Sequence, residues 1–261
     1  MSNWTEAGRG GCLVAAPRYA EAVARLFCLP YAGGGAHAYR ALAAAVAPAV
    51  HVVAIRLPGR ESRYREPVVI DTNALAESIA HLDDLPYAIY GHSMGALLGF
   101  DVTRTILATD RTAPRRLYVA ASRAPDSHTR GPLDGLSAFD DLELVGTLVR
   151  YGGMPEHVAA DAQLLKLVLP TVRRDLAWCD AHRYRPGPSI TTAITAIAGR
   201  DDPSVAPDEL DDWRRHTSGG FQRRTLAGGH FFLDENLPAL ATLIGADLQA
   251  TAAVTAHAVQ S

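Results

Sequence analysis

The feature that most constrains the fold is a short apolar run that ends in a serine flanked by glycines. Residues 86–100 read PYAIYGHSMGALLGF, so Ser93 stands at the centre of a G-x-S-x-G pattern. An apolar strand before this pattern and a helix-forming run after it are what a nucleophile elbow requires. The elbow holds its serine in a strained conformation, and only small residues such as Gly91 and Gly95 fit two positions away. The alternative is an ordinary strand-to-helix turn with an exposed serine.

The rest of the chain alternates between strand-like and helix-like patterns. Strands are predicted at residues 24–29, 50–57, 116–122, 190–198 and 221–226, and helices at 37–47, 72–82, 207–216 and 238–253. This alternation indicates βαβ units. We therefore expect an α/β fold with a mostly parallel sheet flanked by helices.

One segment breaks the alternation. Residues 123–187 show helical patterns at 138–150 and at 160–182, the second interrupted by Pro170. An insertion at this point would lie over the carboxyl ends of the strands, where ligands bind, so we expect a lid. Residues 1–22 are polar and glycine-rich and predict a loose N-terminal leader, which leaves residues 23–261 as a single domain.

Composition excludes several classes of protein. A net charge of −3 argues against a nucleic-acid partner, and three cysteines without a C-x-x-C pair suggest neither a zinc site nor a disulfide framework. No basic segment precedes an apolar one at the N-terminus, and no apolar run reaches the roughly 18 residues of a membrane span. We expect a cytoplasmic protein with no membrane segment and no metal.

Acyl transfer by a serine needs a base and an oriented carboxylate. His230 follows two glycines after the last predicted strand, and it is the only one of the ten histidines placed in this way. The alternative for it is a structural loop histidine. Asp201 and Asp202 are adjacent, so only one can meet His230; the G-x-x-D-P spacing from Gly199 favours Asp202, with Asp201 as the alternative. The resulting order Ser, Asp, His is that of α/β-hydrolases.

An oxyanion requires two N–H donors. Met94, which follows the serine, is the first candidate. The second lies in the glycine-rich loop at residues 30–36, where we favour Ala32 over Tyr31. A phosphate-binding loop is the competing interpretation, but the Gly-Lys-Ser/Thr ending of a P-loop is missing. We interpret His92, next to the serine, as structural.

Five segments together resemble the type II thioesterases that accompany modular polyketide synthases and nonribosomal peptide synthetases. They are LFCLPYAGG at 26–34, LPGRE at 57–61, GHSMGA at 91–96, G-x-x-D-P at 199–203 and GGHFFL at 228–233. The resemblance extends over residues 26–240. It includes two segments of the expected lid, 151–156 and 169–175, although Arg174 stands where the family more often has a small residue.

The resemblance implies a stand-alone editing hydrolase with an α/β-hydrolase core and a mobile helical lid. Such enzymes remove stalled acyl groups from the phosphopantetheine arm of acyl or peptidyl carrier proteins. Ser93 would attack the thioester, His230 would accept its proton, Asp202 would hold the imidazolium, and the Met94 and Ala32 N–H groups would stabilise the oxyanion. No metal or other cofactor is needed, and we expect a monomer.

A carrier partner suggests a basic docking face, because carrier proteins are usually acidic. The lid region supplies Arg150, Arg173, Arg174, Arg183 and Arg185. The alternative is that these are solvated helix arginines and internal ion pairs. A broad esterase or an acyltransferase of the same fold remains possible, as does a carrier-binding protein without activity. The choice between polyketide and peptide pathways stays open.

Overall fold

The computed structural model describes residues 4–7, 9–82 and 84–258. Its sheet has the order β1-β2-β4-β3-β5-β6-β7-β8, in which β3 to β8 are mutually parallel and β1 and β2 are antiparallel additions at one edge. The strands are β1 (Thr5–Ala7), β2 (Leu13–Ala15), β3 (Ala24–Leu29), β4 (Val50–Ile55), β5 (Tyr87–His92), β6 (Arg116–Ala120), β7 (Ala193–Gly199) and β8 (Phe221–Leu226). The predicted parallel α/β sheet is confirmed.

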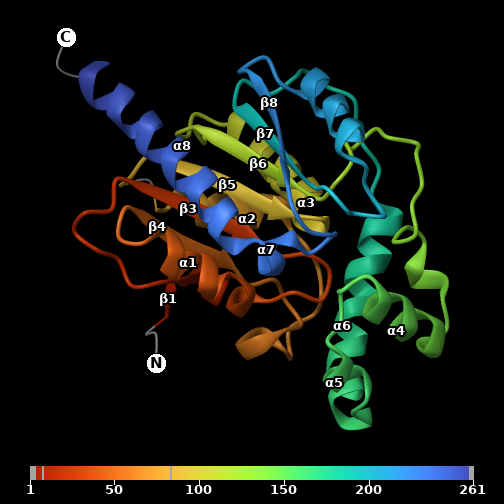
Figure 1. The fold of residues 1–261 in the computed structure, drawn as a ribbon. Helices are drawn as coiled ribbons and strands as arrows, with labels where there is room; N and C mark the ends of the chain where they lie inside the picture. Colours follow the sequence, from red (N-terminus) through yellow and green to blue (C-terminus); the bar gives the residue numbers. More distant parts are fainter. Residues whose placement is uncertain (1–3, 8, 83, 259–261) are drawn as a thin grey trace.

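Helices cover both faces of this sheet (Figure 1). Helices α1 (Arg40–Val46) and α8 (Leu237–Ala258) pack together on one face, and α2 (Thr72–Ala80) and α3 (Met94–Leu107) on the other. Alternate side chains of a strand supply the two cores, as the period of two requires. In β3, Leu26 and Cys28 join the α1 and α8 side, whereas Phe27 and Leu29 join the α2 and α3 side.

The prediction of a loose leader at residues 1–22 is wrong for most of that segment. Strand β2 pairs with β4, and Leu13 is fully buried. The buried Arg56 holds the segment in place by donating to the Gly11 carbonyl at 2.7 Å. The apolar run at residues 12–16 is too short to signal a strand by pattern alone. Residues 1–3 and 8 lie outside the described residues.

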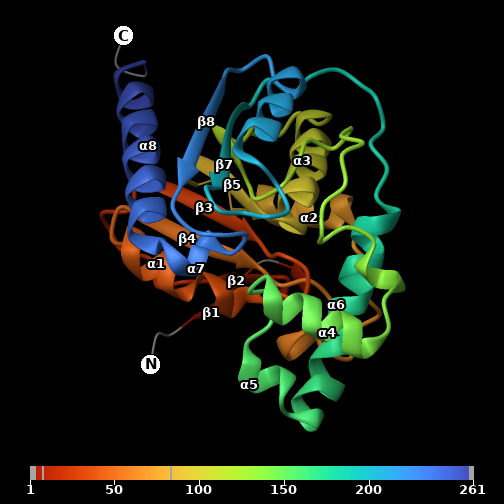
Figure 2. The same ribbon diagram turned by 45° about the vertical axis from the view of Figure 1, so that its right-hand side comes forward.

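The segment between β6 and β7 contains the short 3-10 helix η4 (Leu136–Ala138) and the helices α4 (Asp141–Arg150), α5 (Glu156–Ala159) and α6 (Ala162–Ala181). These helices form a group beside the sheet with a small apolar core of their own (Figure 2). Helix α6 continues through Pro170, where an interruption was predicted.

Two smaller features complete the fold. The helix predicted at residues 207–216 is a 3-10 helix, η5 (Pro207–His216), and a short helix, α7 (Phe232–Glu235), follows β8. Within the described ranges, no helix is both long and apolar enough to cross a bilayer.

Candidate active site

Ser93 occupies a tight turn between β5 and α3. Its backbone has φ 53° and ψ −115°, a conformation that a non-glycine residue adopts only under strain. A Cβ on Gly91 would lie 2.0 Å from the Gly95 carbonyl oxygen, and one on Gly95 would lie 2.2 Å from the Leu29 carbonyl oxygen. No side chain fits at either position, so the two glycines allow the turn and Ser93 forms the predicted elbow.

Three side chains from the carboxyl ends of different strands meet at this turn. His230 Nε2 lies 3.0 Å from Ser93 Oγ, and His230 Nδ1 lies 2.9 Å from Asp202 Oδ2. Asp202 and His230 are both buried. The other oxygen of Asp202 accepts the N–H groups of Ser204 at 2.8 Å and Val205 at 3.2 Å, which fixes the carboxylate toward the imidazole. The arrangement has the connectivity of a nucleophile, a base and an orienting acid.

The alternative acid, Asp201, does not join this group. Its side chain is exposed, and its backbone N–H donates to the Gly228 carbonyl at 3.0 Å. The structure therefore brings Asp202, and not Asp201, to His230. Adjacent residues in this turn point in different directions, as the sequence argument assumed.

Ala32 and Met94 line the same pocket as Ser93. Met94 is the first residue of α3, so its N–H has no acceptor within the helix. The Tyr31 carbonyl accepts the Gly34 N–H at 2.9 Å. Because the Tyr31 C=O and the Ala32 N–H belong to one trans peptide, they point in opposite directions, and the Ala32 N–H faces away from the turn. The Tyr31 carbonyl is thus engaged within the turn, and Ala32 as the second oxyanion donor stays a prediction.

His92 supports the base from behind. Its ring is fully buried, its Nε2 donates to the His230 carbonyl at 2.8 Å, and it stacks on Phe231. Burial, together with the nearby His230, lowers the pKa of His92 to about 3. The neutral imidazole therefore holds the backbone of His230, in agreement with the structural interpretation of His92.

The lowered pKa of His92 predicts a specific pH dependence of stability. Between about pH 6.5 and 3 the unfolded chain binds a proton at His92 that the folded chain does not, so the free energy of unfolding falls as the pH falls. For this residue alone the loss from pH 7 to pH 5 is about 2 kcal/mol. His92→Gln should show a correspondingly smaller loss in urea unfolding at the two pH values. If the free energy of unfolding fell equally from pH 7 to pH 5 in His92→Gln and in the wild type, the lowered pKa of His92 would be contradicted.

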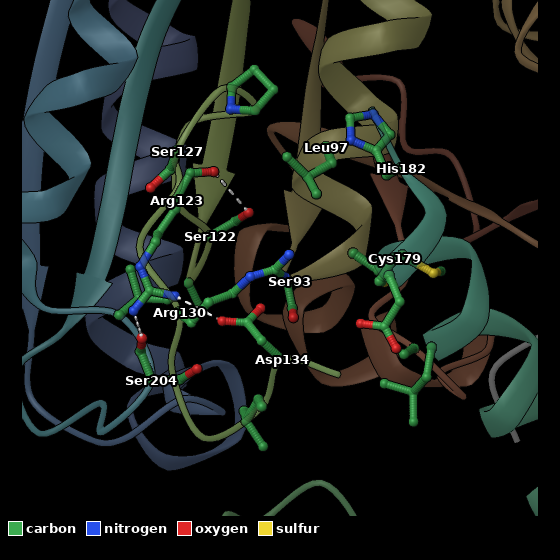
Figure 3. Close-up of a pocket in the computed structure, with 18 of the residues that line it drawn as sticks. Ser93, Leu97, Ser122, Arg123, Ser127, Arg130, Asp134, Cys179, His182 and Ser204 are labelled. Atoms are coloured by element: carbon green, nitrogen blue, oxygen red, sulfur yellow. Dashed lines mark hydrogen bonds and ion pairs between the residues drawn. The ribbon is translucent and has the colours of Figure 1, made fainter. Parts of the chain in front are cut away.

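The pocket beside Ser93 has a volume of about 750 Å³ and is lined by both apolar and polar side chains. The inserted segment supplies leucines and, near the end of α6, the polar Asp180, His182 and Arg183, while the loop after β6 supplies further polar side chains (Figure 3). The apolar set includes Leu97, Leu136, Leu148, Leu176 and Phe231; the polar set includes Arg123, Ser127, Arg130, Asp134 and Ser204. A site of this kind suits a ligand with an apolar part and a polar part.

Sequence reasoning missed the loop after β6. Arg123 anchors it by donating to Glu209 at 2.9 Å and to Asp134 at 3.3 Å, whereas Arg130 reaches into the pocket (Figure 3). The available signal was position, since polar residues that follow a parallel strand lie at the ligand-binding edge of the sheet. In the described part of the chain, no group of three or more His, Cys, Asp or Glu side chains could hold a metal ion.

Comparisons with known proteins identify relatives of this chain. The family model described as "Thioesterase domain" matches residues 24–248. The chain is 36% identical over 242 residues to the "Probable cadicidin biosynthesis thioesterase" of Streptomyces griseus. The matched region covers 87% of this chain but only 63% of that relative. It is 34% identical to "Thioesterase PikA5" of Streptomyces venezuelae over 81% of this chain and 76% of the relative. The solved type II thioesterase BorB from the borrelidin biosynthetic cluster superposes with a TM-score of 0.77 at 37% identity, covering 89% of this chain and 95% of BorB.

Proposed function

The chain belongs to the thioesterase family, and on that premise we propose that it hydrolyses acyl groups from the phosphopantetheine arm of carrier proteins in polyketide or nonribosomal peptide synthesis. The observation that carries the proposal is the hydrogen-bonded series Ser93, His230 and Asp202 beside an amphipathic pocket. Relatives named as biosynthetic thioesterases, including a type II enzyme, support the stand-alone editing role.

The proposed reaction proceeds in two steps. In the first, His230 Nε2 takes the Ser93 proton while Oγ attacks the thioester carbonyl, and the N–H groups of Met94 and Ala32 stabilise the oxyanion. The C–S bond then breaks, and the arm leaves as a thiol with the proton from His230. In the second step, His230 takes a proton from water, the hydroxide attacks the acyl-enzyme, and the free acid leaves as Ser93 regains its proton. Asp202 stabilises the imidazolium in both steps.

The apolar and polar lining of the pocket suits the two parts of this substrate. The apolar side chains, including Leu136, Leu148 and Leu176, take the acyl chain, and the polar side chains take the amide-containing arm. Apolar surface supplies binding energy, whereas the few polar groups set orientation. In this proposal the inserted helices determine which acyl chains are accepted and act as the lid expected from the sequence.

The basic residues proposed for docking are not equivalent. Arg173 donates to Asp141 at 2.9 Å, which is an internal ion pair. Arg183 donates to the carbonyls of Asp180 and His182 in its own segment. Arg150, Arg174 and Arg185 are exposed and form no ion pair with any described residue. Of the five arginines proposed for docking, these three are the better candidates to meet an acidic carrier.

Reversing the charge of Arg150 tests the carrier partner. We expect Arg150→Glu to raise KM about fivefold for an acyl carrier protein at low salt, because like charges now meet across the interface. KM for a small acyl-N-acetylcysteamine thioester should not change. Arg115→Glu, at an exposed position immediately before β6 and so at the amino ends of the parallel strands, is the matched control. Equal effects on both substrates would exclude docking through Arg150.

The function is tested by comparing acceptors. Purified protein is given an acyl thioester, an oxygen ester of the same acid, and candidate alcohol or amine acceptors, and the products are identified. Free acid from the thioester, formed faster than from the ester and regardless of acceptor, supports a thioesterase. Faster ester cleavage would favour a broad esterase, and acyl transfer an acyltransferase. A protein whose Ser93 does not react with a fluorophosphonate would be a carrier-binding protein without activity.

Three further expectations belong to the proposal. The reaction needs no cofactor, because serine, histidine and aspartate supply the nucleophile and the proton transfers. The protein acts as a monomer in the cytoplasm. The net charge of −3 gives no support for a nucleic-acid partner. The described helices give no support for a membrane segment.

A further inference from the structure

Helix α6 of the inserted segment contacts two loops that follow core strands, the one after β3 and the one after β4. Thr171 Oγ1 donates to the Gly59 carbonyl at 2.8 Å. Gly33 has φ 77°, and a Cβ there would lie only 2.6 Å from Val172 Cγ2. The absence of a side chain at Gly33 therefore lets α6 pack directly on the turn that contains Ala32.

A buried ion pair lies at the centre of this contact. Asp175, on α6, is fully buried, and its Oδ1 lies 2.7 Å from Arg60 Nη2, which is also buried. Asp175 Oδ2 accepts the Gly33 N–H at 2.8 Å, and Arg60 Nη1 donates to the Gly34 carbonyl at 2.6 Å. The pair thus hydrogen-bonds both the Gly33 N–H and the Gly34 carbonyl of one turn.

These contacts determine the direction of the Ala32 N–H. The Gly34 N–H donates to the Tyr31 carbonyl, so fixing Gly33 and Gly34 fixes that carbonyl. The Tyr31 carbonyl and the Ala32 N–H belong to the same planar peptide, and one cannot rotate without the other. The path from Asp175 to the Ala32 N–H runs through its hydrogen bond with the Gly33 N–H, the Gly34 N–H to Tyr31 carbonyl bond and the Tyr31–Ala32 peptide.

The pair is not explained by stability alone. Arg60 Nε is buried and has no hydrogen-bond partner among the described residues. Buried ion pairs often add little to stability compared with apolar residues of the same size, because desolvation is costly. Asp175 and Arg60 instead satisfy the backbone groups of a turn beside the reacting atoms.

We propose that Asp175 and Arg60 are positioning residues that aim the Ala32 N–H at the oxyanion only while α6 is seated on the core. The inference rests on the proposed acyl-transfer function. It makes the inserted helices part of the oxyanion site as well as the wall of the acyl pocket. A substrate that displaces α6 would then lose transition-state stabilisation, which couples acyl fit to rate.

The test compares the transition state with the ground state. Asp175→Asn keeps the size of the side chain but removes the charge that pairs with Arg60. We expect kcat to fall about a hundredfold, the effect of losing one oxyanion donor, with KM changed less than about threefold. Binding of a trifluoromethyl ketone analogue, which forms an oxyanion with Ser93, should weaken by the same factor as kcat/KM. Binding of an unreactive amide analogue should stay constant.

Two control variants separate positioning from folding. Asp141→Asn, on α4, breaks the ion pair with Arg173. Arg173 is on α6, as Asp175 is, but lies away from the turn, so kcat should stay unchanged. The double variant Arg60→Met with Asp175→Leu restores an apolar contact and should fold, yet should remain slow. Normal kcat in a folded Asp175→Asn or in the double variant would overturn the proposal, as would equal weakening of both analogues.

Measuring a p-nitrophenyl ester in parallel keeps the two proposals distinct. If the wild type cleaves the ester but no thioester, the thioesterase function fails, and the Asp175 variants still test the oxyanion site on the ester. If the wild type cleaves thioesters and Asp175→Asn does so equally well, only the positioning role fails.

Discussion

Replacing Ser93 by alanine is expected to lower kcat for acyl thioesters at least about a thousandfold, by comparison with triad deletions in other serine hydrolases. His230 Nε2 lies 3.0 Å from the hydroxyl, whose loss leaves water to attack without a covalent intermediate. The measurement is thioester hydrolysis under saturating substrate, followed as release of thiol.

Folding must be unchanged for this result to be informative. Alanine carries a Cβ, as serine does, so the positive φ at position 93 costs the variant no more than the wild type. Thermal unfolding of both proteins provides the control. Activity within about tenfold of the wild type, in a folded variant, would remove the elbow from the mechanism.

Replacing Asp202 by asparagine is expected to lower kcat about ten-thousandfold. An amide at this position is neutral and cannot stabilise the imidazolium that forms on His230, and it can present an N–H donor to Nδ1 in place of an acceptor. Asp202 Oδ2 is 2.9 Å from Nδ1, and Oδ1 is already held by two backbone N–H groups.

The adjacent aspartate provides the matched control. Asp201→Asn makes the same chemical change one residue earlier, on an exposed side chain, and kcat should stay within about twofold. The two variants are compared for kcat with one thioester at one pH. A larger loss in Asp201→Asn than in Asp202→Asn would transfer the orienting role to Asp201.

The sequence was most informative where chemistry depends on neighbours in the chain. Gly91 and Gly95 indicate a turn that admits no Cβ. In the structure, a Cβ at either residue would lie within 2.2 Å of a backbone atom. The parallel order of β3 to β8 then brings strand ends together, so a serine, an aspartate and a histidine that each follow a strand meet at one edge. Strand periodicity and turn chemistry were therefore enough to predict that Ser93, Asp202 and His230 meet, while their catalytic roles stay a prediction.

Contacts between distant segments could not be derived in this way. Arg60 belongs to the LPGRE segment at 57–61, but nothing near it in the sequence shows that it is buried against Asp175, 115 residues away. Asp175 lies three residues after the buried Val172, so helical spacing placed it on the inner face of α6, yet nothing local named its partner. Strand β2, which lies between β1 and β4, was missed because three residues carry too short a pattern.

The most direct test is intact-mass spectrometry of a carrier protein whose arm is loaded with acetyl, propionyl, longer acyl or aminoacyl groups. Each is incubated with the wild type and with Ser93→Ala. We predict that the wild type removes the acyl mass and leaves the arm, at rates that rank the acyl groups, and that the variant does not. An acyl mass that persists with a wild-type protein whose Ser93 still reacts with a fluorophosphonate would contradict carrier-thioester hydrolysis.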